Sequence, residues 1–524
     1  MRVLIFHGYL LRGTGSNVYN ASLAQTLKRL GHEVHLLCQD RTANELDWVG
    51  EGGPGSVTVH VPDIGGLLPV YVADRYEGFE VKTFPELIDA ELDRYLDANV
   101  AAVRAVVERH GAPDAALANH LIMGPVILAR AGLEFALKVH GSDLSYTVRP
   151  HPERFAPYAR EGAEAASGIL VGSGHTARDL FETVPDDLDG KTRLGPPGVD
   201  VERFRPRERG EADAALDHLA GRLESEHVST SSPPSGRKST SGVPSGRATR
   251  GDGSDSFARD GRAATEALRA WALAEERILF VGKLLVNKGV DLLLAAWPLI
   301  HARRVEAGAA APTLLFAGFG AYRPGAEALI DALGRGDLDG ARAVAAKGRA
   351  YEDGPERGLP ILSGFLADPP DGYAEAARAA AGSIHLCGRL EHDEVAEVMP
   401  AADAFAMPST FPEAFGMVPA EAAACGVPPV SAAHSGMREV SVKLAEALPP
   451  ELRPLLSFEV GPGALAELAE RLEGWLALES GRRRELGRAL SARVAELWSW
   501  DRVADGVIAA SQGRLGDVPP VTPE

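Results

Sequence analysis

The sequence predicts an α/β protein made of two doubly wound parallel sheets that face each other across a cleft. Three observations lead to this prediction. Short apolar runs alternate with longer helical stretches over the first 200 residues, a polar stretch rich in Ser and Gly interrupts the alternation, and the alternation then restarts. Repeated strand–loop–helix units are typical of parallel sheets with helices on both faces.

The first half of the chain, residues 1–205, is predicted to form the first sheet. A glycine-rich loop at residues 13–17 follows the first apolar run and precedes a helical pattern that reaches Leu30. The predicted strands are residues 3–6, 33–38, 115–118, 135–139 and 168–171. Because ligands of open α/β sheets bind at the loops after the strands, we expect the functional residues in those loops.

A linker is predicted over residues 206–275. Within it, residues 229–256 contain 9 Ser, 5 Gly and 3 Pro among 28 residues. Such a stretch has too few apolar side chains to offset the entropy lost on ordering. We therefore expect a disordered insertion between the two sheets.

The second sheet and its helices are predicted over residues 276–494. Its expected strands are residues 277–281, 313–317, 383–386, 404–407 and 429–431, and residues 289–301 are expected to be helical. An Ala- and Gly-rich stretch from about 332 to 381 is predicted to be a partly helical insertion. The tail, residues 465–512, has a strong helical pattern in which Trp498 and Trp500 are predicted packing anchors.

Composition and charge exclude several classes of protein. The 524 residues carry a formal net charge of −19, and 45% of them are hydrophobic. The chain is thus too apolar for a disordered protein and too acidic for non-specific nucleic-acid binding. No apolar run approaches 18 residues, and the N-terminus resembles a first strand more than a signal peptide. Cys38, Cys387 and Cys425 lack metal-ligand spacing and are expected to be reduced core residues of a cytoplasmic protein.

The segment from Met407 to Ala422 carries the strongest functional signal. It follows a predicted strand and opens a helix expected from Met417 through Ala424, whose first N–H groups would form an anion site suited to a diphosphate. Glu413 and Glu421 are eight residues apart and could face one hydroxyl-rich ligand. Taken singly, Glu413 is equally an ordinary helix-start acid and Glu421 a surface residue.

This segment, with Gly426 to Pro428 and Ser435 to Glu439 after it, resembles the E-x7-E donor signature of GT-B glycosyltransferases of family 4. The resemblance implies two Rossmann-like domains, with a C-terminal helix at about 495–515 crossing back to the first domain. It also implies that Glu413 contacts the transferred sugar and Glu421 the ribose of the nucleotide. The family's usual Gly-Gly before the later helix is Ser435 and Gly436 in this sequence.

Other segments resemble the same family in the same order. Lys283 and Lys288 match its two pyrophosphate-binding cations, although Lys283 stands where Arg is usual and so loses a bidentate contact. His140 matches the histidine beside the sugar, to which we assign orientation and charge stabilisation. The resemblance thus implies the catalytic residues His140, Glu413 and Lys288. The donor-binding residues that it implies are Gly15, Lys283, Lys288, Arg389, Leu390, Glu413, Phe415, Gly416, Met417, Val418 and Glu421.

The function predicted from this resemblance is transfer of a sugar from a nucleotide-diphosphate sugar to an acceptor hydroxyl, with retention of anomeric configuration. No metal is expected, because two lysines and a helix start already face the leaving diphosphate. The acceptor stays open between a glycan, a lipid-linked and a small molecule, and so does peripheral membrane association. Two alternatives remain: an epimerase or hydrolase of the same fold, and a non-catalytic nucleotide-sugar-binding protein.

Overall fold

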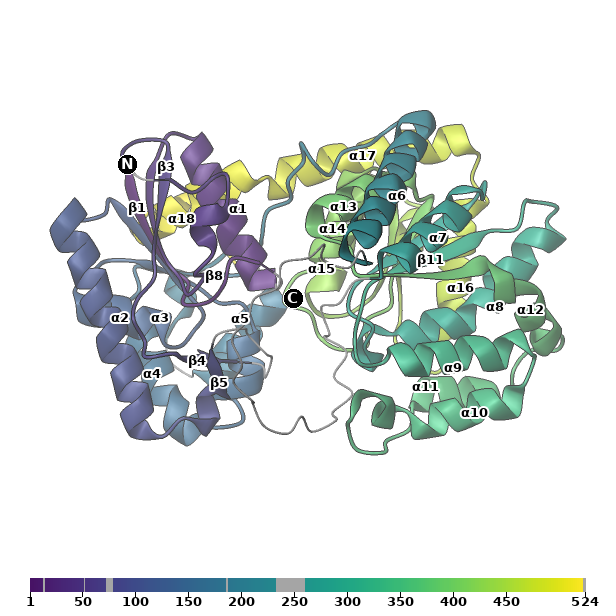
Figure 1. Cartoon of the computed structure of the whole chain (residues 1–524), viewed down its shortest axis with the longest axis horizontal. Coiled ribbons are helices and arrows are strands. Elements are labelled where there is room, and N and C mark those ends of the chain that lie inside the picture. The colour runs from purple at the N-terminus through teal and green to yellow at the C-terminus, as the bar shows by residue number, and fades with distance from the viewer. Residues whose placement is uncertain (13–14, 51, 72–78, 185–186, 232–259, 522–524) are drawn as a thin grey trace, which may run out of the picture.

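The structure, a computed structural model, describes residues 1–12, 15–50, 52–71, 79–184, 187–231 and 260–521. The chain forms two lobes, each built on a parallel sheet with helices on both faces (Figure 1). The predicted fold class is therefore confirmed.

The first lobe contains a sheet of seven described strands in the order β3-β2-β1-β6-β7-β8-β9, all of them parallel. The strands are β1 (Arg2–Phe6), β2 (Glu33–Leu37), β3 (Ser56–His60), β6 (Ala115–Asn119), β7 (Ala136–Lys138), β8 (Gly168–Val171) and β9 (Thr192–Leu194). A separate parallel pair consists of β4 (Leu67–Val70) and β5 (Glu80–Thr83). The helices that follow these strands are α1 (Gly15–Arg29), α2 (Asp89–His110), α3 (Gly124–Ala131), α4 (Pro152–Ala165) and α5 (Gly174–Thr183).

Both faces of this sheet are buried, as the apolar strand sequences require. In β1, the side chains of Val3 and Ile5 join the hydrophobic core on one face, and those of Leu4 and Phe6 join the core on the other. The strand order reverses between β1 and β6, and ligand-binding crevices form at the carboxyl ends of strands at such reversals.

The second lobe contains a sheet of six described strands in the order β12-β11-β10-β13-β14-β15, also parallel. The strands are β10 (Arg277–Val281), β11 (Thr313–Ala317), β12 (Ile384–Gly388), β13 (Ala404–Met407), β14 (Pro429–Ala432) and β15 (Ser457–Phe458). The order here reverses between β10 and β13. The helices around this sheet are α8 (Val290–Glu306), α9 (Arg323–Gly334), α10 (Leu338–Lys347), α11 (Pro360–Ala367), α12 (Tyr373–Ala380), α13 (His392–Val398), α14 (Met417–Ala424), α15 (Ser435–Ala445) and α16 (Ala464–Leu476).

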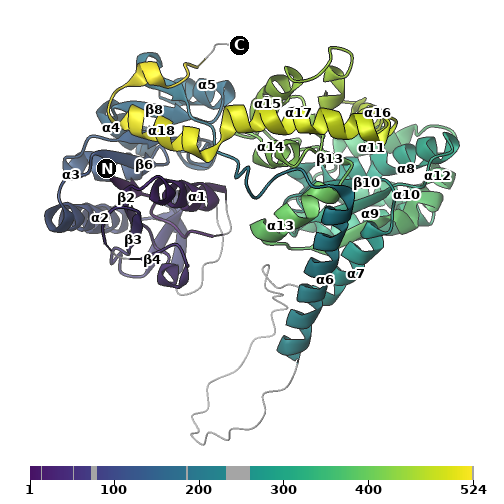
Figure 2. The ribbon, with the colours of Figure 1, turned by 90° about the horizontal axis from the view of Figure 1, so that it is seen from above.

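The prediction of a simple linker over residues 206–275 is wrong at both ends of that stretch. Helices α6 (Arg209–Ser231) and α7 (Gly261–Ala272) pack on each other and on the second lobe (Figure 2). The physical reason is an apolar stripe at helical spacing, Ala212, Leu216, Leu219 and Leu223, which is buried in the second core. The predicted disordered insertion, residues 229–256, lies outside the described residues from position 232 onward.

The C-terminal helices join the two lobes. Helix α17 (Ser480–Trp498) packs on the second lobe, and α18 (Trp500–Ser511) packs on the first sheet, so that the pair crosses between them (Figure 2). At the junction, Val199 N donates a hydrogen bond of 2.7 Å to Trp498 O. Trp498 and Trp500 are both buried, as predicted, but they belong to the cores of different lobes.

Within the part of the chain that the structure describes, no helix has both the length and the apolar character needed to cross a bilayer. The three cysteines are buried and form no disulfide bond, as expected.

Candidate active site

A cleft of about 430 Å³ lies between the lobes, at the carboxyl ends of strands from both sheets. Its walls include nine of the predicted site residues, contributed by segments that are far apart in the chain. These nine are Gly15, His140, Lys283, Lys288, Glu413, Phe415, Gly416, Met417 and Val418. Gly13 and Thr14, which precede Gly15 in the predicted glycine-rich loop, lie outside the described residues.

Lys288 and Glu413 meet at the second-lobe wall of the cleft, where Lys288 Nζ donates to Glu413 Oε1. Lys288 ends a short 3₁₀ turn, and Gly289 then adopts a positive φ of 68°. A Cβ atom on Gly289 would lie 1.9 Å from Pro408 O, so only glycine allows this turn to approach the loop after β13. Ser409 Oγ donates to the same Glu413 oxygen over 3.0 Å, which fixes the carboxylate beside the lysine.

The backbone of Glu413 is held by the residues that replace the family's Gly-Gly pair. Glu413 N donates to Ser435 Oγ over 2.9 Å, and Gly436 N donates to Glu413 O over 3.0 Å. Ser435 has a φ of 53°, a left-handed conformation that glycine adopts more easily than serine does. A Cβ on Gly436 would lie 2.6 Å from Phe415 Cα, which explains why the second glycine is present. The serine thus combines a strained backbone with a hydrogen bond that glycine could not make.

The N-terminus of α14 opens into the cleft. The helix spans Met417–Ala424, the range predicted from the sequence, and its N-cap residue Gly416 supplies no side-chain hydrogen bond. Gly416, Met417 and Val418 all line the cleft. The first N–H groups of the helix, at its positive dipole end, therefore line the same cleft as Lys288. Together, these N–H groups and the lysine suit an anionic group.

His140 lies on the first-lobe wall, in the loop after β7. Its Nε2 is 2.9 Å from Asn119 Oδ1, and Asn119 Nδ2 donates to Phe6 O over 3.1 Å. This orientation of the amide makes Oδ1 the acceptor and places the imidazole proton on Nε2. Burial, together with the neighbouring His120, Lys138 and His7, lowers the pKa of His140 well below its ordinary value. The lowered pKa favours the neutral ring, and the role of His140 in orientation and charge stabilisation stays a prediction.

Two further buried groups line the same wall. Burial lowers the pKa of Lys138 to about 7, and its Nζ donates to Gly195 O over 2.6 Å. His120 packs between Tyr71 and His140, with ring centroids 4.4 and 4.7 Å away, and among the described residues neither of its ring nitrogens has a hydrogen-bond partner. Both ring nitrogens are buried, and Nδ1 lies 3.9 Å from Asp143 Oδ2.

Direct contacts between the lobes border the cleft. The carboxylate of Glu439 on α15 accepts hydrogen bonds from Gly174 N (2.9 Å) and His175 N (3.0 Å), the first residues of α5. Thr176 Oγ1 donates to Ala414 O over 3.3 Å. The loop that carries Glu413 therefore lies directly against the first lobe.

Two family models match the chain. One described as a glycosyl transferase 4-like domain matches residues 14–188, and one described as glycosyl transferases group 1 matches residues 374–484. The chain belongs to the GT-B glycosyltransferases of family 4 type. The two matched regions contribute the opposite walls of the cleft.

A curated protein and solved structures are similar to this GT-B chain. The D-inositol 3-phosphate glycosyltransferase of Actinosynnema mirum is 29% identical over 213 residues, which are 38% of this chain and 46% of that protein. The match therefore spans about half the length of the relative. Sucrose-phosphate synthase from Thermosynechococcus elongatus superposes with a TM-score of 0.55 at 17% identity, over 98% of each chain. The HepE protein of Anabaena in complex with UDP-glucose gives 0.54 at 13% identity, over 98% of this chain and 100% of that one. These likenesses show a shared GT-B fold.

Three predicted donor residues do not line the cleft of this GT-B protein. Glu421 is buried in α14, and its Oε1 lies 2.8 Å from His392 Nε2. Burial opposes the charge of His392, but the Glu421 carboxylate outweighs it and raises the pKa of the imidazole. Arg389 forms an ion pair of 2.9 Å with Glu391 and lies over the Phe319 ring, and Leu390 packs against the second core. Their proposed contacts with ribose and base stay predictions.

Sequence reasoning missed Asn119, His120, Lys138 and Ser435. Asn119 and Lys138 are the last residues of β6 and β7, so the signal that could have found them is a polar residue at the carboxyl end of an apolar strand. In the sequence, Ser435 stands out only as a departure from the family's glycine. Its bond to Glu413 depends on a φ value that the sequence does not reveal.

Proposed function

We propose that this chain transfers a sugar from a nucleoside-diphosphate sugar to a hydroxyl group of an acceptor, with retention of anomeric configuration. One observation carries the proposal. Lys288, Glu413 and the N-terminus of α14 lie together on one wall of the cleft, and His140 lies on the opposite wall. The cation and the helix start suit a diphosphate, whereas the carboxylate and the imidazole suit sugar hydroxyl groups. Such a pairing of surfaces fits a ligand that is anionic at one end and hydroxylated at the other.

The donor diphosphate would lie against the start of α14, within reach of Lys283 and Lys288. As the bond between the anomeric carbon and the phosphate oxygen breaks, negative charge grows on that oxygen, and fixed N–H dipoles and cations stabilise it. These groups are already in place, so the proposal requires no divalent metal for the leaving group. The Lys288–Glu413 pair would open in part, because Lys288 would then face phosphate and Glu413 the sugar.

The acceptor hydroxyl would attack the anomeric carbon on the face from which the diphosphate departs. A new bond from the anomeric carbon to the acceptor oxygen forms there, and the acceptor proton passes to the departing phosphate oxygen. Neutral His140 would hydrogen-bond the sugar from the first lobe. No protein nucleophile takes part in this scheme.

The neighbours guide the choice of donor to be tested. The HepE protein of Anabaena is named in complex with UDP-glucose, and the curated relative of Actinosynnema mirum is named for an inositol phosphate acceptor. A panel of UDP-, GDP- and ADP-hexoses, screened by thermal shift, would identify the donor. Turnover would then be measured with hydroxyl acceptors, inositol phosphate among them. NMR of the anomeric proton in the first-formed product would determine its anomeric configuration. An inverted linkage would contradict the mechanism, and release of free sugar whether or not an acceptor is present would indicate a hydrolase.

A further inference from the structure

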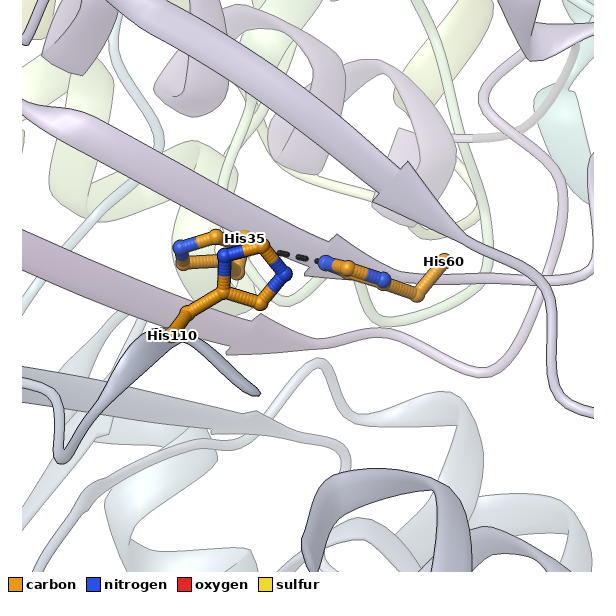
Figure 3. Close-up of side chains that lie close together, drawn as sticks. All are labelled: His35, His60 and His110. Atoms are coloured by element: carbon orange, nitrogen blue, oxygen red, sulfur yellow. Dashed lines mark hydrogen bonds between the residues drawn. The ribbon is translucent and has the colours of Figure 1, made fainter. Parts of the chain in front are cut away.

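Three histidines form a cluster in the first lobe, and none of them lines the cleft. His35 lies on β2, His60 is the last residue of β3, and His110 is the last residue of α2. Figure 3 shows the three rings close together, with His35 and His60 joined by a hydrogen bond. One ring nitrogen from each histidine lies within 4.8 Å of the other two. The fold therefore gathers three imidazoles from positions 25 and 50 residues apart.

The spacing of these nitrogens is close to that of metal ligands. Zinc–imidazole bonds of about 2.0–2.1 Å in a tetrahedral arrangement separate ligand nitrogens by about 3.3 Å. His35 Nδ1 and His60 Nε2 are 3.1 Å apart. The His110 ring lies 4.4 Å from the His35 ring and 5.7 Å from the His60 ring, measured between centroids. A small rotation of side chains would bring the third nitrogen to ligand distance.

The hydrogen bonding of the cluster is incomplete. His35 is only 1% exposed, and His110 Nε2 is buried without a hydrogen-bond partner among the described residues. Buried polar atoms that lack a partner are costly and call for a ligand or an ion.

A carboxylate lies behind the cluster. Glu33 Oε1 is 3.5 Å from His35 Nε2, the nitrogen that points away from His60. In metal sites the second ring nitrogen of a ligating histidine usually faces such a carboxylate, which orients the ring and increases its basicity. Glu33 also pairs with Arg2, while Arg109 lies near His60. The nearby charges thus include two cations and one acid, and the attraction for an ion must come mainly from the imidazoles.

We infer that His35, His60 and His110 bind a divalent transition-metal ion of the zinc class, with water at the remaining position. Three imidazoles are a ligand set that suits zinc, cobalt, nickel and copper and does not suit magnesium or calcium. The ion would tie the edge strand β3 and the end of α2 to β2. Its role is to stabilise the first lobe, and the inference is independent of the proposed transfer reaction.

Metal titration of the full, untagged chain after chelator treatment tests this inference. We expect one equivalent of Zn²⁺ to bind, to raise the melting temperature and to compete with Co²⁺, whose visible spectrum would report tetrahedral nitrogen coordination. His60→Gln and His110→Gln should each weaken Zn²⁺ binding by more than about 100-fold, since loss of an outer partner alone costs about 10–100-fold. Glu33→Gln should fall within that smaller range. His151→Gln, an exposed histidine of the same lobe, serves as the matched control.

Two outcomes would overturn the inference. One is failure of the wild-type chain to bind stoichiometric Zn²⁺ or Co²⁺, a measurement that depends on no variant. The other is binding that His60→Gln and His110→Gln leave as tight as in the His151→Gln control. Circular dichroism of each metal-free variant would verify that it is folded. If a variant did not fold, the Co²⁺ spectrum of the wild-type chain would test for metal binding by nitrogen ligands.

Discussion

The two lobes build their walls of the cleft in different ways. The second lobe uses one nearly continuous segment: the loop after β13, the start of α14 and the Ser435 turn surround Glu413. Among the described residues of this lobe that line the cleft, only Lys283 and Lys288 come from elsewhere. The first lobe uses single residues from separate strand ends, among them His120, Lys138 and His140. The second wall holds an exposed cation and a helix dipole, whereas the first holds buried neutral rings. The contrast indicates charge recognition on one side and hydroxyl recognition on the other.

The largest expected effect tests the charged wall. Lys288→Ala should lower turnover by about 10²–10³-fold and also weaken binding of nucleoside diphosphate, because it removes a positive charge from the developing phosphate anion. Isothermal titration and steady-state kinetics measure the two quantities. Lys443→Ala, an exposed lysine on α15, is the control. Unchanged affinity and turnover in Lys288→Ala would remove this residue from the site.

A second prediction concerns the buried lysine of the neutral wall. The pKa of Lys138 in the folded chain is about 7, below its unfolded value of about 10.4. The unfolded chain thus binds more protons between these values, and the contribution of Lys138 to stability rises as pH increases from about 7 to 10. Lys138→Met should remove roughly 2–4 kcal/mol of this pH-dependent change in the free energy of unfolding. Denaturant titrations at several pH values measure it, and parallel curves for both proteins would contradict a buried neutral lysine.

His140→Ala tests the first-lobe wall, which is expected to contact the sugar. Turnover should fall by about 10²-fold, while affinity for the free nucleoside diphosphate should stay within a factor of three, because His140 lies on the lobe opposite the anion site. His175→Ala is a useful control, since its backbone, not its ring, contacts Glu439. An equal loss of diphosphate affinity would mean that both walls bind the phosphates.

The smallest effect separates strain from hydrogen bonding at Ser435. Ser435→Ala keeps the left-handed φ and loses the bond from Glu413 N, so it should destabilise the chain by about 1–2 kcal/mol. Ser435→Gly loses the same bond but relieves the strain, and it should be less destabilising than Ser435→Ala by about 1 kcal/mol. Thermal or denaturant unfolding of the two variants gives the difference. Equal stabilities would show that the backbone at this position is unstrained.

Features formed by one continuous segment could be predicted well from the sequence. Features that depend on contacts between distant segments could not. Helix α14 was predicted from Met417 to Ala424 because a strand, a loop and a run of small residues follow one another there. The helices α6 and α7 were missed because the Ser-rich stretch between them dominates the composition of residues 206–275. The strands β3, β4, β5, β9 and β15 were also missed, and all five lie at a sheet edge or outside the two main sheets. Their sequences are short or carry polar residues, which weakens the apolar signal.

The residues of the candidate site show the same difference between local motifs and tertiary contacts. Glu413, Lys288 and the start of α14 belong to local motifs, and the structure brings them together. The contact of His140 with Asn119 spans 21 residues and depends on the pairing of β6 with β7. The histidine cluster depends on the register of β2 with β3 and on the length of α2. Contacts of this kind follow from tertiary packing and have no fixed spacing in the sequence.

The packing of α18 has a consequence for the order in which the protein matures on the ribosome. One face of the first sheet is covered by side chains of this helix, including Val503, Ala504 and Val507. The strands of that sheet leave the ribosome hundreds of residues before α18 does. The lobe that is synthesised first is therefore completed last, and its uncovered apolar face is a natural binding site for chaperones during translation.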